Sequence, residues 1–493
     1  MAYRDLRDYL GLLESHGKLR RVKRQVDPSW ELSCMARWVY QGFPEDRRFG
    51  LLFENVKGSS MSVGTALIGA SRDVYALAMG ATPEKIHDTW LRALRNPLPP
   101  KLVNSGPAHE VVIPKEKVDL TSLPVPTWTP GKDVTPCITA CVITRDRDSG
   151  VQNIGTYRCQ VQSKNQITLN TNPGRQGYQN YESYAARGEA APVAVAIGCE
   201  PAVHLATSAA LPKGMDEMHV AGALKGEPIE VVRGKTVDIL VPAHAEIVVE
   251  GLLHPTGRMV EGGFGEFAGY MGHAAERIWF EVTAITHRRN PIYYGYTSQC
   301  PPSESTMIQG QANECVIHWQ LIDVFGEQTV TDVAINQTHG GLMGHAVVQM
   351  TPLYGGHAKK VGRLVCEMSH IKMVTLVDTG IDVRYQQHLD WVWNSLINPA
   401  TDVVIIKDAC MFFDPSQDAA GRSGKMVLDA THKIGHSYTD LSLPPKHLLW
   451  KAYESWQDTD LPAFNIPQRV EHSLDWHARR LERSEKGRFL GLG

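Results

Sequence analysis

The sequence has no run of about eighteen consecutive apolar residues, so no helix is expected to span a membrane. Its net charge of −3 over 493 residues lacks the basic excess that a nucleic-acid-binding surface needs. The nine cysteines are scattered without a CxxC pair, which argues against a disulfide scaffold and for a reducing compartment. The first 22 residues lack the apolar core of a secretory signal. We therefore expect a soluble cytoplasmic protein.

The chain is too long for one hydrophobic core and divides by pattern into three regions. Residues 1–115 alternate helical and strand patterns and end in a proline-rich linker. Residues 116–310 carry many short strands bounded by turn residues, which is typical of a barrel or sandwich. Residues 311–493 alternate strands and helices again, ending in a charged helical tail from Arg469. These patterns predict a multidomain α/β fold with a β-rich centre.

Some local elements can be predicted residue by residue. The helical spacing of Leu6, Tyr9, Leu10 and Leu13 predicts an amphipathic helix over 6–18. Ser71 is a suitable N-cap for a helix that follows it. Residues 373–378 form a short apolar run ending in an acid, which predicts a buried strand.

One glycine-rich stretch carries two acids, Glu261 and Glu266, with three glycines between them. On a regular strand the two carboxylates would point to opposite faces because side chains alternate. Glycines allow a tight turn and a close approach of other groups. The spacing therefore allows a turn that aims both carboxylates at one point, although a surface hairpin with two solvated acids fits the same letters.

An arginine, Arg158, lies within a predicted strand of the β-rich region. A buried guanidinium needs an anionic partner, and Glu261 and Glu266 are suitable partners. Repulsion between two acids raises the pKa of one of them while the arginine lowers it, so such a group can move a proton near neutral pH. A structural salt bridge is the alternative interpretation.

Two oxygen-bearing side chains, those of Asn153 and Glu217, are candidate ligands for Mg²⁺ or Mn²⁺ bound to a phosphate. Their spacing alone does not distinguish them from an ordinary strand amide and an acid at a helix start.

Seven motifs occur in one order: NIGTYR, PVAVAIGCEPA, MDEMHVAGALKGEPIEVV, PAHAEIVVEG, EGGFGEFAGY, PPSEST and GRSGKMVLDAT. As an ordered set they resemble the UbiD family of decarboxylases, which use prenylated FMN, and the resemblance covers essentially the whole chain. It implies an N-terminal α/β region (1–115), a central split β-barrel similar to flavin reductases (116–310) and a C-terminal α/β domain used in oligomer contacts (311–493).

The resemblance also implies roles for individual residues. Arg158, Glu261 and Glu266 match the family's catalytic network, with Glu266 at the position of the proton donor. Asn153 and Glu217 match ligands of the divalent metal, Mn²⁺ or Mg²⁺ with K⁺ as a further ion, that holds the cofactor phosphate. The cofactor-binding positions that match are Thr139, Asn153, Thr156, Tyr157, Arg158, Leu169, Asn170, Pro173, Glu217 and Lys425.

The sequence departs from the family at one point. Many members have a histidine fifteen to eighteen residues after the arginine, and this chain has none there. Asn172 or Gln176 occupies that stretch, so only two protein metal ligands are carried over.

The expected activity is reversible, non-oxidative decarboxylation of an aromatic, heteroaromatic or α,β-unsaturated carboxylic acid through covalent bonding to prenylated FMN. Loss of CO₂ from an sp² carbon leaves a carbanion for which no side chain is an electron sink, so a cofactor must supply one. The alternatives are a 4-hydroxy-3-polyprenylbenzoate decarboxylase, an FMN-dependent oxidoreductase and a non-catalytic subunit. Expected partners are a small acid, a flavin prenyltransferase and further copies in a homodimer or homohexamer.

Overall fold

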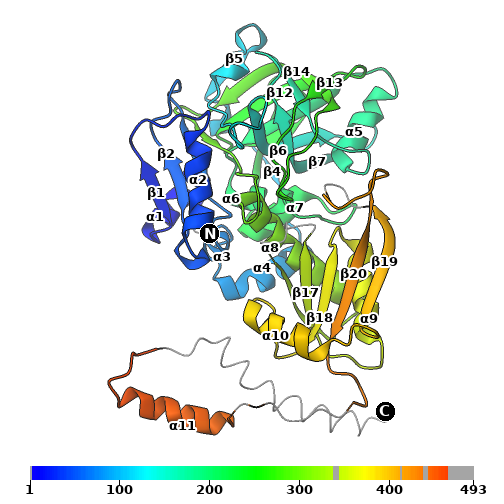
Figure 1. Ribbon diagram of the computed structural model, residues 1–493. Helices are drawn as coiled ribbons and strands as arrows, with labels where there is room; N and C mark the ends of the chain where they lie inside the picture. Colours follow the sequence, from blue (N-terminus) through cyan, green and yellow to red (C-terminus); the bar gives the residue numbers. More distant parts are fainter. Residues whose placement is uncertain (1–2, 337–343, 411–413, 437–441, 443, 465–493) are drawn as a thin grey trace. The chain divides into compact units, whose positions relative to one another are not determined.

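The computed structural model describes residues 3–336, 344–410, 414–436, 442 and 444–464. These residues fall into two compact units, one up to Val316 and the other from Ile317 onward, and each unit is described by itself. The multidomain α/β architecture expected from the sequence is present (Figure 1). The predicted tail helix from Arg469 lies outside the described residues.

The first unit begins with a small α/β region. Its four-stranded sheet has the order β1-β2-β3-β15, in which β1 and β2 run parallel, β3 is antiparallel to β2, and β15 runs parallel to β3. The strands are β1 (Leu19–Val22), β2 (Gly50–Phe53), β3 (Ser62–Thr65) and β15 (Ile292–Tyr294). The accompanying helices are α1 (Leu6–Ser15), α2 (Glu31–Gly42), α3 (Arg72–Leu77) and α4 (Ile86–Arg95). The predicted apolar face of α1 is buried, and Ser71 caps α3 by accepting a hydrogen bond from the Val74 amide.

An eight-stranded antiparallel sheet forms the centre of this unit. Its path is β13-β14-β12-β9-β6-β7, while β5 and β8 also pair with the long strand β14. The strands are β5 (Val111–Pro114), β6 (Cys137–Arg145), β7 (Gln152–Gln160), β8 (Gln166–Leu169), β9 (Ala191–Ile197), β12 (Ile247–Leu253), β13 (Met259–Glu261) and β14 (Ala275–His287). Val161, the residue after β7, forms an isolated bridge to Ile167 of β8, and no continuous ladder joins β7 to β8 among the described strands. The sheet is therefore not closed into a barrel, and the split barrel stays a prediction.

The remaining elements of the first unit are helical or short. A three-stranded sheet has the order β11-β10-β4. Its strands are β4 (Lys101–Leu102), β10 (Glu230–Arg233) and β11 (Leu240–Pro242), and the helices are α5 (Gln176–Ala185), α6 (Pro201–Thr207), α7 (Glu217–Lys225) and α8 (Glu304–Trp319), whose last residues belong to the second unit. Asp216 caps α7 by accepting hydrogen bonds from two amides, which places Glu217 at the first helical position.

The second unit is built on a five-stranded mixed sheet with the order β16-β17-β18-β20-β19. Its elements are β16 (Val330–Ile335), β17 (His345–Met350), α9 (His357–Met368), β18 (Met373–Asp378), α10 (Gln386–Leu396), β19 (Val403–Cys410), β20 (Arg422–Ala430) and α11 (Lys446–Gln457). One apolar cluster joins the sheet to α9 and another joins it to α10. The consecutive residues Val347 and Val348 of β17 point to opposite faces of the sheet and belong to different clusters, so both faces are covered.

Candidate active site

Arg158 lies between two carboxylates. Its Nε and one terminal nitrogen donate to Glu261 Oε1 at 2.9 and 2.7 Å, and its other terminal nitrogen pairs with Glu266 Oε1. The three side chains are at most 10% exposed. The turn after β13 therefore brings both acids to one guanidinium, as the glycine-rich spacing allowed.

Close packing explains why the stretch between the two acids is rich in glycine. A Cβ on Gly262 would lie 2.7 Å from Val134 Cβ, and a Cβ on Gly265 would lie 2.2 Å from Thr129 Oγ1. Gly262 N also donates to Gln160 Oε1 at 2.7 Å, and Glu266 N donates to the Tyr270 carbonyl at 2.9 Å. These contacts hold the turn against its neighbours, so the carboxylate positions are set by backbone packing.

The two acids have different surroundings. Glu261 also accepts hydrogen bonds from Asn170 Nδ2 at 2.8 Å and Thr168 Oγ1 at 3.1 Å, so each of its oxygens has a donor. These donors hold the Glu261 carboxylate in one position. For Glu266 the described side-chain contact is the single pair with Arg158. Glu266 is therefore better suited than Glu261 to bind and release a proton.

A second arginine, Arg277 on β14, adds positive charge beside this network. Its Nε lies 4.0 Å from Glu261 Oε1. Burial lowers the pKa of Arg277, and the nearby Arg158 lowers it further while Glu261 raises it. The Arg277 Nε is buried and has no hydrogen-bond partner within the described part of the chain.

Asn153 and Glu217, the predicted metal ligands, meet although they lie on different elements. Asn153 Nδ2 donates to Glu217 Oε1 at 2.9 Å, and Ile154 N donates to Glu217 Oε2 at 3.4 Å. Burial raises the pKa of the Glu217 carboxyl to about 7. A buried carboxyl group next to an amide fits a divalent cation, because the ion would supply the counter-charge that Glu217 lacks. Tyr157 also contacts this pair, because its Oη donates to Asn153 Oδ1 at 3.4 Å.

Most of the predicted cofactor positions lie on β6 and β7 or just after β8. Thr139 pairs with Arg158 across the two strands, and its hydroxyl bonds the backbone of Tyr296. Thr156 Oγ1 lies 3.2 Å from Thr207 Oγ1 and 3.4 Å from Ser208 Oγ. Leu169 is buried, and Pro173 is exposed in the turn before α5.

Lys425 lies in the second unit. Its Nζ donates to the backbone carbonyls of Cys366 and Ser369 at the end of α9, and burial lowers its pKa. These bonds give Lys425 a helix-capping role within its own unit, and its predicted cofactor contact stays a prediction.

Sequence reasoning did not identify several polar neighbours of the network. Thr168, Gln160 and Arg277 all contact the stretch that carries Glu261, and Thr207 and Ser208 contact Thr156. Their pairing depends on strand register and on turns between distant segments, for which the local sequence gives no signal.

Three family models match the chain in order. They are the N-terminal domain of 3-octaprenyl-4-hydroxybenzoate carboxy-lyase at residues 10–94, its Rift-related domain at 101–301 and its C-terminal domain at 309–430. The structure of the UbiD-class enzyme HmfF from Pelotomaculum thermopropionicum in complex with FMN is 35% identical. That match covers 90% of this chain and 98% of HmfF, with a TM-score of 0.81.

Two further relatives span nearly the same length. The vanillic acid decarboxylase of Sedimentibacter hydroxybenzoicus in its closed form is 28% identical over 93% of this chain and 100% of that chain, with a TM-score of 0.84. An uncharacterized protein of Synechocystis sp. is 29% identical over 94% of this chain and 98% of its own length. The fold and the matched domains define a carboxy-lyase. The chain belongs to the UbiD family.

Within the described residues, the structure contains no helix with both the length and the apolar composition needed to cross a membrane.

Proposed function

We propose that this protein catalyses the reversible, non-oxidative decarboxylation of an aromatic, heteroaromatic or α,β-unsaturated carboxylic acid with prenylated FMN. The observation that carries the proposal is the buried Arg158 held between Glu261 and Glu266. The match to HmfF over 90% of the chain supports it.

The three network residues have distinct roles in this proposal. Arg158 orients the substrate carboxylate by charge-assisted hydrogen bonds. The bond between the carboxylate and the sp² carbon breaks, CO₂ leaves, and Glu266 delivers a proton to that carbon. Glu261 accepts hydrogen bonds from Arg158, Asn170 and Thr168, and it fixes the position of the guanidinium. In the carboxylation direction Glu266 accepts the proton instead.

The cofactor supplies, when bound, the electron sink that no side chain offers. Asn153 and Glu217 would hold Mn²⁺ or Mg²⁺ next to the cofactor phosphate, with K⁺ as a further ion. The other proposed cofactor-binding residues are Thr139, Thr156, Tyr157, Leu169, Asn170, Pro173 and Lys425. The hydroxyls of Thr207 and Ser208, next to Thr156, are additional candidates.

The larger organisation belongs to the same proposal: along the chain, an α/β domain at 1–115, a split barrel at 116–310 and an α/β domain at 311–493. A flavin prenyltransferase would supply the cofactor, and copies of the chain would assemble as a homodimer or homohexamer. The HmfF relative has been solved as an evolved dimeric form in complex with prFMN.

The proposed substrate is a phenolic or heteroaromatic acid. The vanillic acid decarboxylase relative supports this class, and the family description keeps 4-hydroxy-3-polyprenylbenzoate as the alternative. The test is a panel of aromatic and acrylic acids, incubated with the reconstituted enzyme while CO₂ release and bicarbonate-dependent H/D exchange are measured. Turnover of at least one acid supports the proposal, and no turnover of any acid by a fully loaded enzyme contradicts it.

Two controls separate this proposal from the other classes. The visible spectrum and anaerobic NAD(P)H oxidation identify an ordinary FMN oxidoreductase. Asn153→Ala and Glu217→Ala test the metal assignment, because both should be purified with much less flavin than the wild type. An unchanged flavin content in both variants contradicts the assignment of these two ligands.

A further inference from the structure

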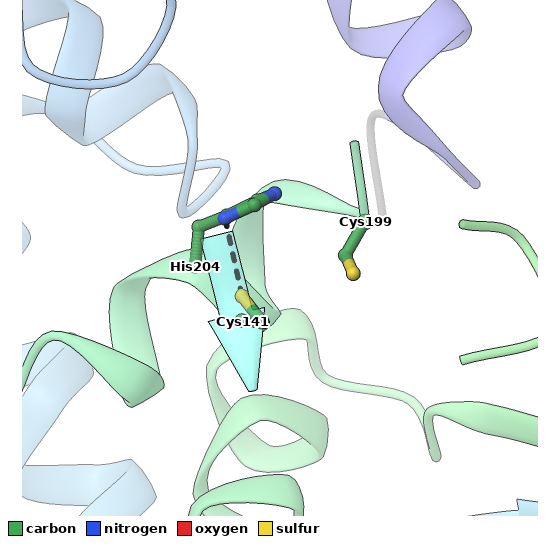
Figure 2. A group of neighbouring side chains, drawn as sticks. All are labelled: Cys141, Cys199 and His204. Carbon is green, nitrogen blue, oxygen red and sulfur yellow. Dashed lines mark hydrogen bonds between the residues drawn. The ribbon is translucent and has the colours of Figure 1, made fainter. Parts of the chain in front are cut away.

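A second group of ligating side chains lies apart from the Asn153–Glu217 pair. Cys141, Cys199 and His204 each present a ligand atom, and these atoms all lie within 4.8 Å of one another (Figure 2). The Cys141 sulfur is 3.4 Å from His204 Nδ1. The three residues are at most 1% exposed, so they are not part of an open surface.

Three different elements bring these residues together. Cys141 lies on β6, opposite Ala196 of β9, and Cys199 follows β9 by two residues. Gly198, which lies between the end of β9 and Cys199, turns the chain at a φ of +67°, and a Cβ at this position would lie 2.8 Å from Glu246 Cβ. His204 lies five residues further, in α6. The cluster is therefore positioned by strand register and a glycine turn, both of which are rigid features of the fold.

The polar groups of the cluster are incompletely satisfied without a ligand. His204 Nε2 is buried and has no hydrogen-bond partner among the described residues. His204 Nδ1, the ring nitrogen that contacts the Cys141 sulfur, also contacts the Tyr296 hydroxyl. A buried ring nitrogen without a partner costs free energy, and the contacts at Nδ1 fix the orientation of the imidazole ring.

Two thiols and an imidazole form a soft donor set. A tetrahedral zinc ion with these ligands places sulfur and nitrogen atoms about 3.5–3.8 Å apart. The Cys141 sulfur and His204 Nδ1 are 3.4 Å apart, and all three ligand atoms lie within 4.8 Å of one another. The Thr207 hydroxyl, 3.5 Å from the Cys141 sulfur, is a candidate fourth donor.

We propose that Cys141, Cys199 and His204 bind one zinc ion or a similar thiophilic cation, at a site distinct from the oxygen-ligand site at Asn153 and Glu217. Binding releases the two thiol protons and involves no redox change. The preference is for Zn²⁺ over Mn²⁺ or Mg²⁺, because thiolates are poor ligands for hard cations.

The bound ion would influence β7, the strand that carries the proposed cofactor-binding residue Thr156, through Thr207. The hydroxyl of Thr207 lies 3.5 Å from the Cys141 sulfur and 3.2 Å from the Thr156 hydroxyl. Cys141 and Thr156 are also direct partners across β6 and β7. A bound ion would hold these groups in one arrangement, and this contribution does not require the decarboxylase chemistry.

The test is a Co²⁺ titration of the full-length, metal-free protein under reducing, anaerobic conditions, followed by Zn²⁺ competition. One equivalent of Co²⁺ should give the visible bands of a tetrahedral site and the ultraviolet charge-transfer intensity of two thiolates. Zn²⁺ should abolish the bands, and excess Mn²⁺ should leave them unchanged. A wild-type spectrum without thiolate bands, or with the intensity of one thiolate, overturns the proposal even if every variant misfolds.

Variants test which residues bind the ion. Cys199→Ala and His204→Gln should lower the Zn²⁺ affinity by at least about 100-fold. Cys366→Ala, a buried cysteine of the second unit, and Cys34→Ser, an exposed one, should bind as the wild type does. Unchanged binding in Cys199→Ala, or loss in both controls, overturns the assignment. Because the readout is metal binding, a failure of the proposed decarboxylase activity does not alter these outcomes.

Discussion

Glu261→Gln and Glu266→Gln are isosteric changes in one ion-pair network, and they should differ in the property that they impair more: stability in Glu261→Gln and activity in Glu266→Gln. Glu261 accepts two bonds from Arg158, at 2.9 and 2.7 Å, and two more from Asn170 and Thr168. Removing one partner of a buried ion pair costs about 3–5 kcal/mol when the other charge is left unpaired, and since Arg158 keeps Glu266 the loss should lie near the lower end of that range. Glu266 makes one described bond to Arg158, which an amide oxygen can still accept. Its replacement should cost at most about 1.5 kcal/mol.

The expected order of activities is the reverse. A glutamine at position 266 cannot deliver a proton, and loss of a general acid lowers a rate by about 10²–10⁴-fold. Glu266→Gln should therefore lose decarboxylation while it retains flavin and nearly all of its unfolding free energy. Urea unfolding and CO₂ release are measured on both variants, each serving as the control for the other. Near-wild-type turnover by Glu266→Gln, or equal loss of stability in the two variants, would refute this division of roles.

Three further predictions test the surroundings. Gly272→Ala places a Cβ 2.9 Å from Glu266 Oε1 and should lower CO₂ release with little change in the urea midpoint. The control variant Gly355→Ala, with open space at its Cβ, should change neither quantity. Equal turnover by the two variants would contradict this prediction. The pKa of Glu217 is raised from 4.5 to about 7, so the folded state retains a proton that the unfolded state loses. The stability of the metal-free protein should therefore fall as the pH rises between these values, and Glu217→Gln should lack this contribution. The test is the urea unfolding midpoint of the wild type and of Glu217→Gln over that pH range. Identical midpoint–pH profiles of the two proteins would contradict the prediction. Arg277→Gln removes a cation that lies 4.0 Å from Glu261 in the Arg158 network, so the pH–rate profile of the enzyme should move upward in pH. A profile that does not shift would disprove this prediction.

The sequence predicted the elements whose signals are local. The helical period of Leu6, Tyr9, Leu10 and Leu13 identified the buried face of α1, and the apolar run at 373–378 coincides with β18. The helix α11 was not predicted, although Leu449, Tyr453 and Trp456 recur in it at helical spacing. The pairing of β15 with β3 joins segments more than 200 residues apart and depends on tertiary packing.

The candidate site could be predicted from the sequence for a different reason. A buried arginine needs anions, and the glycine-rich stretch supplied two acids that could reach it. The resemblance to the UbiD family then selected Asn153 and Glu217, which the structure brings within 2.9 Å. Arg277 and Thr168 reach the same network through strand pairing, and the cysteine–histidine cluster depends on a turn at Gly198. Neither register nor turn geometry could be read from the residues that form them.

The most direct test of the proposed chemistry is deuterium exchange at the carbon that carries the carboxylate. The wild-type enzyme, reconstituted with prenylated FMN and metal, is incubated in D₂O with bicarbonate and the decarboxylated product of any acid that it turns over. The network of Arg158, Glu261 and Glu266 predicts bicarbonate-dependent exchange by the wild type and none by Glu266→Gln. Equal exchange by the two proteins would contradict the assignment of Glu266 as the proton donor.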